Sequence, residues 1–481
     1  MLLLATSQAF IRDSPGDRYV IMRSRYLLNH VIVQSSQVTI TRNRTVTERL
    51  FVHSYGEFWP TVLPNSGQCQ AEMILQRHSI VMSNYNFYGR SKPSNLWQSC
   101  THSFRSRCTL SGMKIDSLEI FHVAMPLIYP WRTAYGADYD IHSVLVKATS
   151  GDHFAWAEST PLERPSYSPE GAAGVFLNVS EYFAPRVVSG EHETAESITD
   201  ALSVFKGNQF AKAALEIVWW TLESKIQSLP LHDLLGGTRK EVQAGADFGI
   251  QDSFDMLLGN IQLAIDAGFP RVKLKVARDW DVEMLKAVRS TFPNEKLHID
   301  CNSGYSLDDL EMFKEIDKFN LEFIEQPLAN DDILDHAELA RSIETPICLD
   351  ESVTGPRVVE QALNIGACEF VNIKPGRVGG LSNSIRIHDI CQDAGVPVWV
   401  GGMLESAIGS AVCVELATLP NFTYPGDLFP SSRFYIRDLG QPEVELTVQQ
   451  TMLPYTNGLP EPDPELLQKF TQQRAVVAPY D

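Results

Sequence analysis

The chain contains 481 residues, of which 44% are hydrophobic and 21% charged, a composition typical of a soluble globular protein with two or three domains. Its formal net charge of −19 disfavours nucleic acid and anionic membranes as partners. No apolar run reaches the roughly 18 residues that a membrane-spanning helix needs, and the apolar segment 1–5 is too short for a secretory signal. We therefore expect a cytoplasmic protein that binds a small molecule, with neither nucleic acid nor membrane as a partner.

The eight cysteines include no CxxC pair and no spacing typical of a zinc site. Five of them lie in or beside apolar segments: Cys301, Cys348, Cys368, Cys391 and Cys413. Buried, reduced thiols in a cytosolic protein are the simplest interpretation of this distribution.

The first 112 residues differ in composition from the rest of the chain. They contain 12 Lys and Arg against 5 Asp and Glu, use Arg almost to the exclusion of Lys, and show no sustained period of 2 or 3.6 residues. A basic arm for nucleic acid or an anionic surface is one interpretation. Because the basic residues are scattered rather than clustered, we favour an extension of uncertain order, or translated sequence upstream of a natural start at Met113.

Regular patterns begin at residue 113. Two segments typical of strands, 117–123 and 141–147, are followed by helical patterns at 172–183 and 210–224. These elements predict an α+β domain over residues 113–235. The pair Gly236-Gly237 follows it as a turn signal.

Residues 236–430 alternate between strand and helix patterns. The predicted strands are 242–248, 271–276, 296–300, 321–325, 347–350, 370–374 and 397–400. The predicted helices are 253–267, 282–291, 306–319, 333–343, 356–365 and 381–394. Seven strands with about six crossovers predict a nearly complete parallel (β/α) barrel of the TIM type. The segment 431–481 is irregular and rich in proline, and we expect it to pack back on the first domain.

Five charged residues end five successive predicted strands: Lys275, Asp300, Glu325, Asp350 and Lys374. Their spacings are 25, 25, 25 and 24 residues, which is the length of one strand, one loop and one helix. A single charge at a strand end is most simply a surface residue, but five in successive units are not explained in that way. Because the active-site groups of parallel barrels come from the carboxyl ends of strands, we expect these side chains to meet at one site.

Three carboxylates from adjacent strands suit one hard divalent cation, Mg²⁺ or alternatively Mn²⁺, which would keep positions for water and a substrate carboxylate. The cation would stabilise the dianion that forms when a proton leaves the carbon next to that carboxylate. A lysine can remove this weakly acidic proton if nearby positive charge lowers the lysine's pKa. The pattern therefore favours a metal-dependent enzyme.

The two lysines of the series would approach a bound substrate from opposite sides. Lys275 lies one strand before Asp300, and Lys374 lies one strand after Asp350. Lys273 shares a strand face with Lys275 under period-2 alternation, and it either lowers the pKa of Lys275 further or forms a structural ion pair. One lysine of the opposed pair would remove a proton and the other return it, or one would supply only charge.

Several segments around these residues carry a resemblance to a known family: 273–275 (Lys-Leu-Lys), 300–302 (Asp-Cys-Asn), 324–327 (Ile-Glu-Gln-Pro), 349–352 (Leu-Asp-Glu-Ser), 372–380 (Asn-Ile-Lys-Pro-Gly-Arg-Val-Gly-Gly) and 401–406 (Gly-Gly-Met-Leu-Glu-Ser). With further matches at 165–168, 205–207 and 419–427, they cover about residues 113–440. The sequence resembles the enolase superfamily and, within it, the o-succinylbenzoate synthase / N-acylamino acid racemase group. Residues 1–112 have no counterpart in that group.

The resemblance implies an α+β capping domain (113–235) over a modified (β/α)7β barrel (236–430), with 431–481 packed on the capping domain. It implies that Asp300, Glu325 and Asp350 bind Mg²⁺ and that Lys275 and Lys374 are the acid/base lysines. It also implies supporting or substrate-binding positions: Lys273, Asn302, Arg377, Gly402, Met403 and Glu405. Loops at 130–137 and 159–168 would close over the site and select the substrate. The resemblance implies no cofactor besides the metal. It also implies that the protein forms a homo-oligomer.

The first function that the resemblance implies is that of o-succinylbenzoate synthase, a hydro-lyase of menaquinone biosynthesis. This enzyme dehydrates a 2-succinyl-6-hydroxy-cyclohexadiene-1-carboxylate to 2-succinylbenzoate by syn elimination through a metal-stabilised enediolate. Lys275 would remove the proton and then, as an ammonium, assist the departure of hydroxide, while Lys374 would supply charge. The alternative is N-acylamino acid racemisation with both lysines as acid and base, and the two activities can coexist in this family.

Other functions fit the residues less well. A mandelate-racemase-type site would place a catalytic His late in the barrel, and a dipeptide epimerase would show Asp-x-Asp where 402–405 read Gly-Met-Leu-Glu. A non-catalytic binding barrel would be expected to have lost a lysine or a metal ligand, and all five residues are present.

Overall fold

The computed structural model describes residues 113–479 with their side chains and, between residues 8 and 83, the backbone of eight strands. The chain divides into two compact units, 1–107 and 108–481. Apart from those strands, the predicted N-terminal extension lies outside the described residues. Within 113–479, none of the helices combines the length and the apolar character needed to cross a bilayer.

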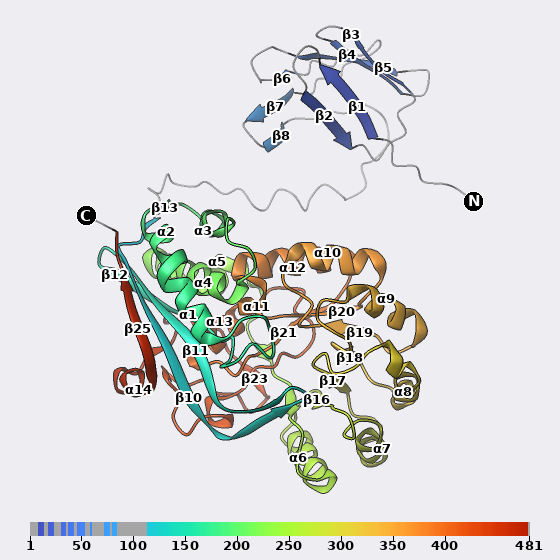
Figure 1. Ribbon diagram of the computed structural model, residues 1–481, viewed down its shortest axis with the longest axis vertical. Helices are drawn as coiled ribbons and strands as arrows, with labels where there is room; N and C mark the ends of the chain where they lie inside the picture. Colours follow the sequence, from blue (N-terminus) through green and yellow to red (C-terminus); the bar gives the residue numbers. More distant parts are fainter. Residues whose placement is uncertain are drawn as a thin grey trace. The chain divides into compact units, whose positions relative to one another are not determined.

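The eight strands of the first unit form small antiparallel sheets, drawn in blue in Figure 1. β1 pairs with β2, β7 pairs with β8, and the order β3-β4-β5-β6 makes a four-stranded sheet. The sequence pattern of this segment does not predict these strands. Their bounds are β1 Gln8–Asp13, β2 Arg18–Arg23, β3 His30–Gln34, β4 Gln37–Arg42, β5 Val46–Val52, β6 Phe58–Trp59, β7 Glu72–Gln76 and β8 Ser79–Ser83.

The second unit begins with an antiparallel sheet of order β12-β11-β10-β25, in which β10 (Ser117–Thr133) and β11 (Gly136–Ser150) form a long hairpin. Helix α4 (Gln209–Gln227) packs on β11 and β12 through an apolar stripe that includes Leu215 and Val218. The other elements of this α+β domain are β9 Met113–Lys114, β12 His153–Ser159, α1 Ala172–Asn178, η1 Val179–Phe183, α2 Ala184–Val188, β13 Glu191–His192, α3 Ala195–Leu202 and α5 Leu231–Leu235.

A curled sheet of seven parallel strands, β15 to β21 in chain order, forms the second domain, and helices between the strands cover its outer face (Figure 1). Its strands are β15 Ala246–Phe248, β16 Val272–Lys275, β17 Leu297–Asp300, β18 Ile324–Glu325, β19 Ile347–Leu349, β20 Phe370–Ile373 and β21 Val398–Val400. Its helices are α6 Phe254–Asp266, α7 Val282–Thr291, η2 Leu307–Asp309, α8 Leu310–Ile316, η3 Asp317–Phe319, α9 Ile333–Ser342, α10 Pro356–Ile365, α11 Pro375–Val378, α12 Leu381–Ala394 and α13 Ala407–Leu416.

An irregular segment, 422–427, joins the two ends of the seven-stranded sheet. On one side, Thr423 and Asp427 donate backbone hydrogen bonds to Val398 and Val400 of β21. On the other side, Gly426 exchanges backbone hydrogen bonds with Gln243 and Gly245, just before β15. The segment thus takes the position of an eighth strand between β21 and β15, which agrees with the predicted (β/α)7β architecture.

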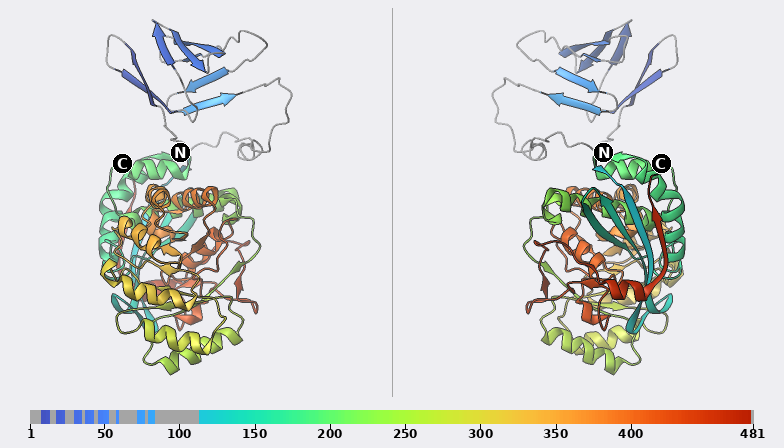
Figure 2. Two further views of the ribbon diagram at one scale, coloured as in Figure 1. Left: turned by 90° about the vertical axis from the view of Figure 1, so that its right-hand side faces the viewer. Right: turned by 90° about the vertical axis from the view of Figure 1, so that its left-hand side faces the viewer.

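The C-terminal segment packs back on the α+β domain that begins at residue 113. β25 (Thr471–Val477) pairs antiparallel with β10, and Figure 2 (right) shows it in red beside the long teal strands. β23 (Thr451–Met452) pairs with β14 (Val242–Gln243) at the base of the barrel. The remaining elements are η4 Ser431–Arg433, β22 Gly440–Gln441, β24 Glu461–Pro462 and α14 Pro464–Phe470.

Most predicted barrel elements coincide with the observed ones. The helices predicted at 282–291, 356–365 and 381–394 have the observed bounds, and six of the strands differ by at most three residues at either end. The strand predicted at 242–248 is interrupted at Gly245, where a Cβ would lie 2.0 Å from the Arg271 side chain. The helix predicted at 306–319 is broken into η2, α8 and η3. The five cysteines expected to be buried are buried, free thiols.

Candidate active site

The strand register brings the predicted charged residues to one end of the barrel. Lys275 pairs in register with Asp300, and Asp300 with Glu325. Asp350 directly follows β19, and Lys374 directly follows β20. All five side chains are buried, with exposed fractions between 0% and 7%. The carboxyl ends of five adjacent parallel strands therefore supply one compact group of charges.

Lys273 lies at the centre of this group. Its Nζ is 2.9 Å from Asp300 Oδ2, 2.8 Å from Glu325 Oε2 and 2.8 Å from Asp427 Oδ2. Lys275 Nζ lies 2.6 Å from Asp300 Oδ2, and Lys374 Nζ lies 3.0 Å from Asp350 Oδ2. Each predicted metal ligand thus has a lysine as its partner, and the structural ion pair considered for Lys273 is present.

Burial and these pairings act on the pKa values in opposite directions. Burial lowers the pKa of Lys275, but the Asp300 carboxylate outweighs it, and the pKa is raised; Asp350 does the same for Lys374. Burial raises the pKa of Asp300, yet Lys273 and Lys275 hold it well below its ordinary value. Both candidate bases therefore carry a proton as long as these carboxylates keep them as partners.

The donor set fits a hard divalent cation. Within residues 113–479 the side chains of His, Cys, Asp and Glu form no group of three with the geometry of a metal site. Lys273 Nζ contacts both Asp300 and Glu325. Burial, and then the charge of Asp300, raises the pKa of Glu325 to about 8. The side-chain oxygen of Asn302 is buried without a hydrogen-bond donor among the described residues. Clustered carboxylate and amide oxygens are the ligands that Mg²⁺ or Mn²⁺ prefers.

Arg377 supports Asp350 from the outer side. Its guanidinium donates hydrogen bonds to Asp350 Oδ1, to the Tyr167 hydroxyl at 2.8 Å and to the backbone oxygens of Asn372 (2.5 Å) and Val353 (2.9 Å). The Tyr167 hydroxyl in turn donates to Asp350 Oδ1 at 3.0 Å. Asp350 is therefore fixed from three directions by Lys374, Arg377 and a tyrosine of the capping domain.

Backbone strain gathers at the same ends of the strands. Asn302, Gln326 and Leu404 have φ values of 43°, 38° and 60°, in the left-handed region that non-glycine residues rarely adopt. Asn302 and Gln326 stand one or two residues after a strand, where such strain re-aims side chains towards a site. Gln326 Oε1 accepts hydrogen bonds from the backbone N–H groups of Asp350 (2.9 Å) and Ser352 (3.2 Å).

The loop after β21 contributes the remaining predicted residues. Gly402 and Met403 line the cavity described below, and a Cβ at Gly402 would lie 2.6 Å from the backbone oxygen of Asp427. Glu405 lies behind the loop: its Oε2 accepts a hydrogen bond from the Met403 N–H at 2.8 Å. Burial raises the pKa of Glu405 to about 7. Glu405 therefore supports the loop and does not line the cavity.

A small cavity of about 40 Å³ separates the two lysines from the capping domain. Lys273, Lys275, Asn302 and Lys374 line it from the barrel. The two loops predicted to close over the site line it from the other side, through Trp131, Tyr135, Leu162 and Tyr167. Arg377 lies outside its lining. The structure thus brings the predicted loops and the predicted lysines onto one cavity.

Three buried carboxylates of this cavity were not predicted as site residues: Asp138, Asp247 and Asp427. Asp427, on the closing segment 422–427, pairs with Lys273 and Arg271. Asp247 ends β15 and lines the cavity beside Lys275. Asp247 is a charged residue at a predicted strand, but it precedes Lys275 by 28 residues and so falls outside the 25-residue spacing. Asp427 follows no predicted strand and gives no such signal.

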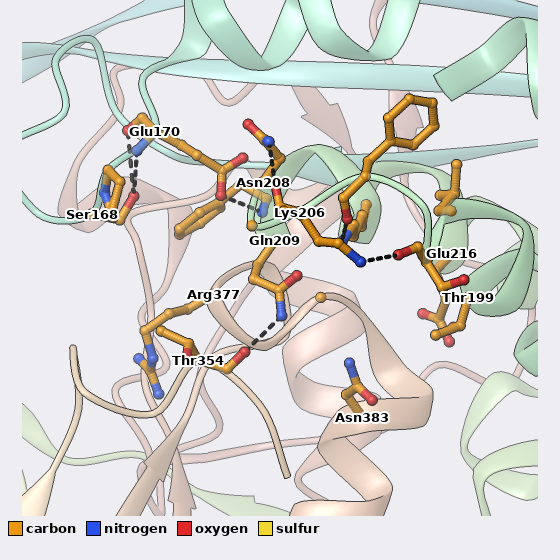
Figure 3. A pocket seen from close by; sticks show the side chains of 18 of the residues that line it. Ser168, Glu170, Thr199, Lys206, Asn208, Gln209, Glu216, Thr354, Arg377 and Asn383 are labelled. Carbon is orange, nitrogen blue, oxygen red and sulfur yellow. Dashed lines mark hydrogen bonds between the residues drawn. The ribbon is translucent and has the colours of Figure 1, made fainter. Parts of the chain in front are cut away.

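A second, larger pocket of about 790 Å³ lies between the capping domain and the barrel loops (Figure 3). One side is lined by Lys206 of the connection between α3 and α4 and by Gln209, the first residue of α4. The other side is lined by Thr354, Arg377 and Asn383. Gln209 bridges the two sides through a hydrogen bond to the Thr354 backbone oxygen at 2.7 Å. Arg377 therefore separates this pocket from Asp350 and the cavity of the lysines.

Two protein families match the chain over most of the second unit. Residues 115–236 match the N-terminal domain of mandelate racemase / muconate lactonizing enzymes, and residues 258–460 match the enolase C-terminal domain-like family. The two matches correspond to the capping domain and to the barrel with part of the segment that follows it.

Curated relatives and solved structures match the same region. An N-succinylamino acid racemase of Amycolatopsis sp is 41% identical over 75% of this chain and 98% of its own length. An o-succinylbenzoate synthase of Geobacillus stearothermophilus is 37% identical over 75% of this chain and 97% of its own. A crystal structure of an enolase superfamily member from Listeria innocua has 32% identity and a TM-score of 0.73, and covers 76% of this chain and 99% of that one.

Proposed function

Because this chain belongs to the enolase superfamily, in the group of o-succinylbenzoate synthases and N-succinylamino acid racemases, we propose that it removes the proton next to a substrate carboxylate. The first reaction that we propose is the dehydration of a 2-succinyl-6-hydroxy-cyclohexadiene-1-carboxylate to 2-succinylbenzoate, in menaquinone biosynthesis. The observation that supports it best is the pair of buried lysines, Lys275 and Lys374, on one cavity beside three buried carboxylates. Cytoplasmic location and a homo-oligomeric state remain predictions.

In this proposal Asp300, Glu325 and Asp350 hold one Mg²⁺ ion, since members of the enolase superfamily generally use a divalent metal. When bound, the ion supplies positive charge next to the substrate carboxylate and so lowers the cost of removing the neighbouring proton. When the charge of Asp300 is compensated, the influences that remain on Lys275 include burial and the charge of Lys273, and both of these lower its pKa. Chelation should abolish turnover and added Mg²⁺ should restore it, whereas full activity in the presence of a chelator would contradict this assignment.

Lys275 then acts as the base in the dehydration. Its neutral amine takes the proton, and the electron pair of the broken C–H bond stays on the substrate carbon. The same side chain, now an ammonium, returns that proton to the departing hydroxide, which leaves as water. Because one lysine serves both steps, proton and hydroxide leave from the same face, as a syn elimination requires. Lys374 keeps its proton and stabilises the developing negative charge.

A second candidate reaction is the racemisation of N-acylamino acids, which the position of Lys374 on the same cavity favours. In this reaction one lysine removes the α-proton and the other delivers a proton to the opposite face, so no group is lost. The first half-reaction is common to both candidates. They differ in whether Lys374 transfers a proton or only supplies charge.

The experiment that tests the proposal is an assay of the purified protein on both substrates in the presence of Mg²⁺. Dehydration is followed by formation of the aromatic product, and racemisation by exchange of the α-proton of each N-succinylamino acid enantiomer in D₂O. We expect kcat/KM to be measurable for at least one of the two substrates. Absence of both product formation and exchange would contradict the proposal.

A further inference from the structure

Asp247 is a buried acidic side chain on the candidate active-site cavity that the reaction steps above do not use. It lies in β15, beside Lys273 of the neighbouring strand, and only 4% of it is exposed. Its neighbours on the cavity include Lys275, Asn302 and Lys374. Asp247 therefore faces the space in which the substrate's reacting carbon would have to lie.

The carboxylate of Asp247 differs in its hydrogen bonding from that of Asp427, which lines the same cavity. Among residues 113–479, no group donates a hydrogen bond to its Oδ1. Asp427 on the same cavity, by contrast, contacts both Arg271 and Lys273. A buried polar atom without a partner costs free energy of folding, so its retention on a cavity wall points to a partner supplied by the ligand.

The backbone around Asp247 is held by hydrogen bonds on both sides. The guanidinium of Arg433 donates a hydrogen bond to the Asp247 backbone oxygen at 2.7 Å. One residue earlier, the N–H of Ala246 donates to the Arg271 backbone oxygen at 3.0 Å. These bonds keep Asp247 in place on the cavity wall, where its carboxylate is available as a hydrogen-bond acceptor.

An acceptor at this position requires a donor on the substrate. Lys275 and Lys374, on the same side of the cavity, are donors that match a carboxylate or a developing negative charge, and Asp427 is already paired with Lys273. Of the two candidate substrates, the N-acylamino acid carries an amide N–H on the reacting carbon itself. The cyclohexadiene carboxylate has only carbon neighbours there, and its hydroxyl is the leaving group that Lys275 protonates.

We propose that Asp247 accepts a hydrogen bond from the amide N–H of an N-acylamino acid and thereby makes the site selective for amides over analogues without that N–H. This inference rests on the proposed proton abstraction and deepens it by naming the substrate class. It gives Asp247 a specificity role, distinct from the proton transfers of Lys275 and Lys374.

The test compares two substrates that differ only in this donor: N-succinyl-phenylalanine and its ester analogue, O-succinyl-3-phenyllactate. Exchange of the α-proton in D₂O gives kcat/KM for each with the wild-type holoenzyme and with Asp247→Ala and Asp247→Asn. The ratio of amide to ester rates, compared between variants, cancels the intrinsic difference in acidity of the two α-protons. Asp266→Ala, at an exposed position at the end of α6, is the matched control.

We expect Asp247→Ala to lower the amide-to-ester ratio by about 10- to 100-fold, the usual effect of losing a hydrogen bond to a charged group. The decrease in kcat/KM should occur with the amide substrate only. The ester has no N–H to donate to the Asp247 carboxylate, so it loses no hydrogen bond when Asp247 is replaced. Asp247→Asn, which keeps an acceptor oxygen and the side-chain volume, should lie between the two, and Asp266→Ala should leave the ratio unchanged.

Other outcomes separate failure of this inference from failure of the proposed function. If Asp247→Ala and Asp247→Asn slow both substrates by the same factor, Asp247 acts through Lys275 or through packing, and the specificity role is wrong. If neither substrate is slowed in either variant, the specificity role is wrong as well. If the wild-type enzyme exchanges neither substrate and forms no aromatic product, the proposed proton abstraction itself is wrong.

Discussion

At the scale of single residues, Lys275 and Lys374 have similar surroundings but are expected to have different roles. Both are buried, both line the cavity, and each has a carboxylate partner within 3.0 Å. Their pKa values are raised by those carboxylates, so neither side chain alone identifies the base. The distinction must come from the face of the substrate that each one reaches.

Substitution of the two lysines should separate dehydration from racemisation. Lys275→Ala should lower kcat of dehydration by about 10²- to 10⁴-fold, because the general base is lost. Lys374→Ala should abolish racemisation, and Lys374→Arg, which keeps the charge but is a poor base, should recover dehydration in part and racemisation not at all. The measurements are kcat for product formation and α-proton exchange from each enantiomer. Unaltered dehydration in Lys275→Ala would show that the base is another residue.

Glu325 should make the metal-free protein less stable as pH rises. Its pKa is 4.5 in an ordinary environment and is raised to about 8 by burial and by Asp300, so the folded state binds its proton more tightly than the unfolded state does. Between about pH 4.5 and 8 the unfolded chain releases this proton while the folded protein retains it, so the stability of the folded state falls as pH rises. Above and below this window Glu325 adds no further pH dependence.

Thermal unfolding with a chelator at pH 5, 6.5 and 8 measures this effect. The Tm difference between Glu325→Gln and wild type should shift in favour of the variant as pH rises, because glutamine removes the ionisation without removing the side-chain volume. Added Mg²⁺ should weaken the pH dependence of the wild type. A Tm difference that stays constant over this range would mean that Glu325 does not titrate as the structure implies.

At the scale of secondary-structure elements, the hairpin of β10 and β11 and the segment 159–168 determine access to the lysines. A cavity of about 40 Å³ has little more room than one water molecule, whose share of liquid volume is about 30 Å³. A substrate with a ring and a succinyl group does not fit without displacement of Tyr135, Leu162 or their neighbours. Opening of these two segments is therefore required before binding.

Backbone hydrogen exchange should detect this opening. Amides of residues 131–137 and 160–168 should exchange faster in the free enzyme than in the complex with Mg²⁺ and 2-succinylbenzoate, since the ligand holds the segments closed. Helix α13, in which every residue is buried, serves as the internal control and should not change. Equal exchange of the two segments with and without ligand would mean that the substrate enters by another route.

The elements that could be predicted from sequence are those with one buried face. α7, α10 and α12 have an apolar stripe, and the period of 3.6 residues located them to the residue. α13 was missed because all ten of its residues are buried, which leaves no polar face to produce a period. The same reasoning applies to the site. Lys275, Asp300 and Glu325 could be proposed because the strand spacing repeats, whereas Tyr167 and Asp427 reach the site through a capping loop and an irregular closing segment.

At the scale of the whole molecule, residues 108–481 form a compact unit with its own core, which holds the entire candidate site. A chain that begins at Met113 should therefore fold, and its kcat/KM and Tm should match those of the full chain. Circular dichroism and the dehydration assay provide the comparison. Loss of folding in the shorter chain would show that residues 1–112 are integral to the protein, and would contradict their interpretation as an extension.

The pairing of β25 with β10 has a consequence for synthesis on the ribosome. The two strands of this antiparallel pair are far apart in the chain; Glu119 and Arg474, which bond across it, are 355 residues apart. β10 and β11 leave the exit tunnel early, but the sheet lacks one edge strand until residues 471–477 have been translated. In the interval the hairpin presents an unpaired strand edge to other nascent chains. Slow translation of the barrel would therefore prolong exposure of that edge and increase the need for a chaperone.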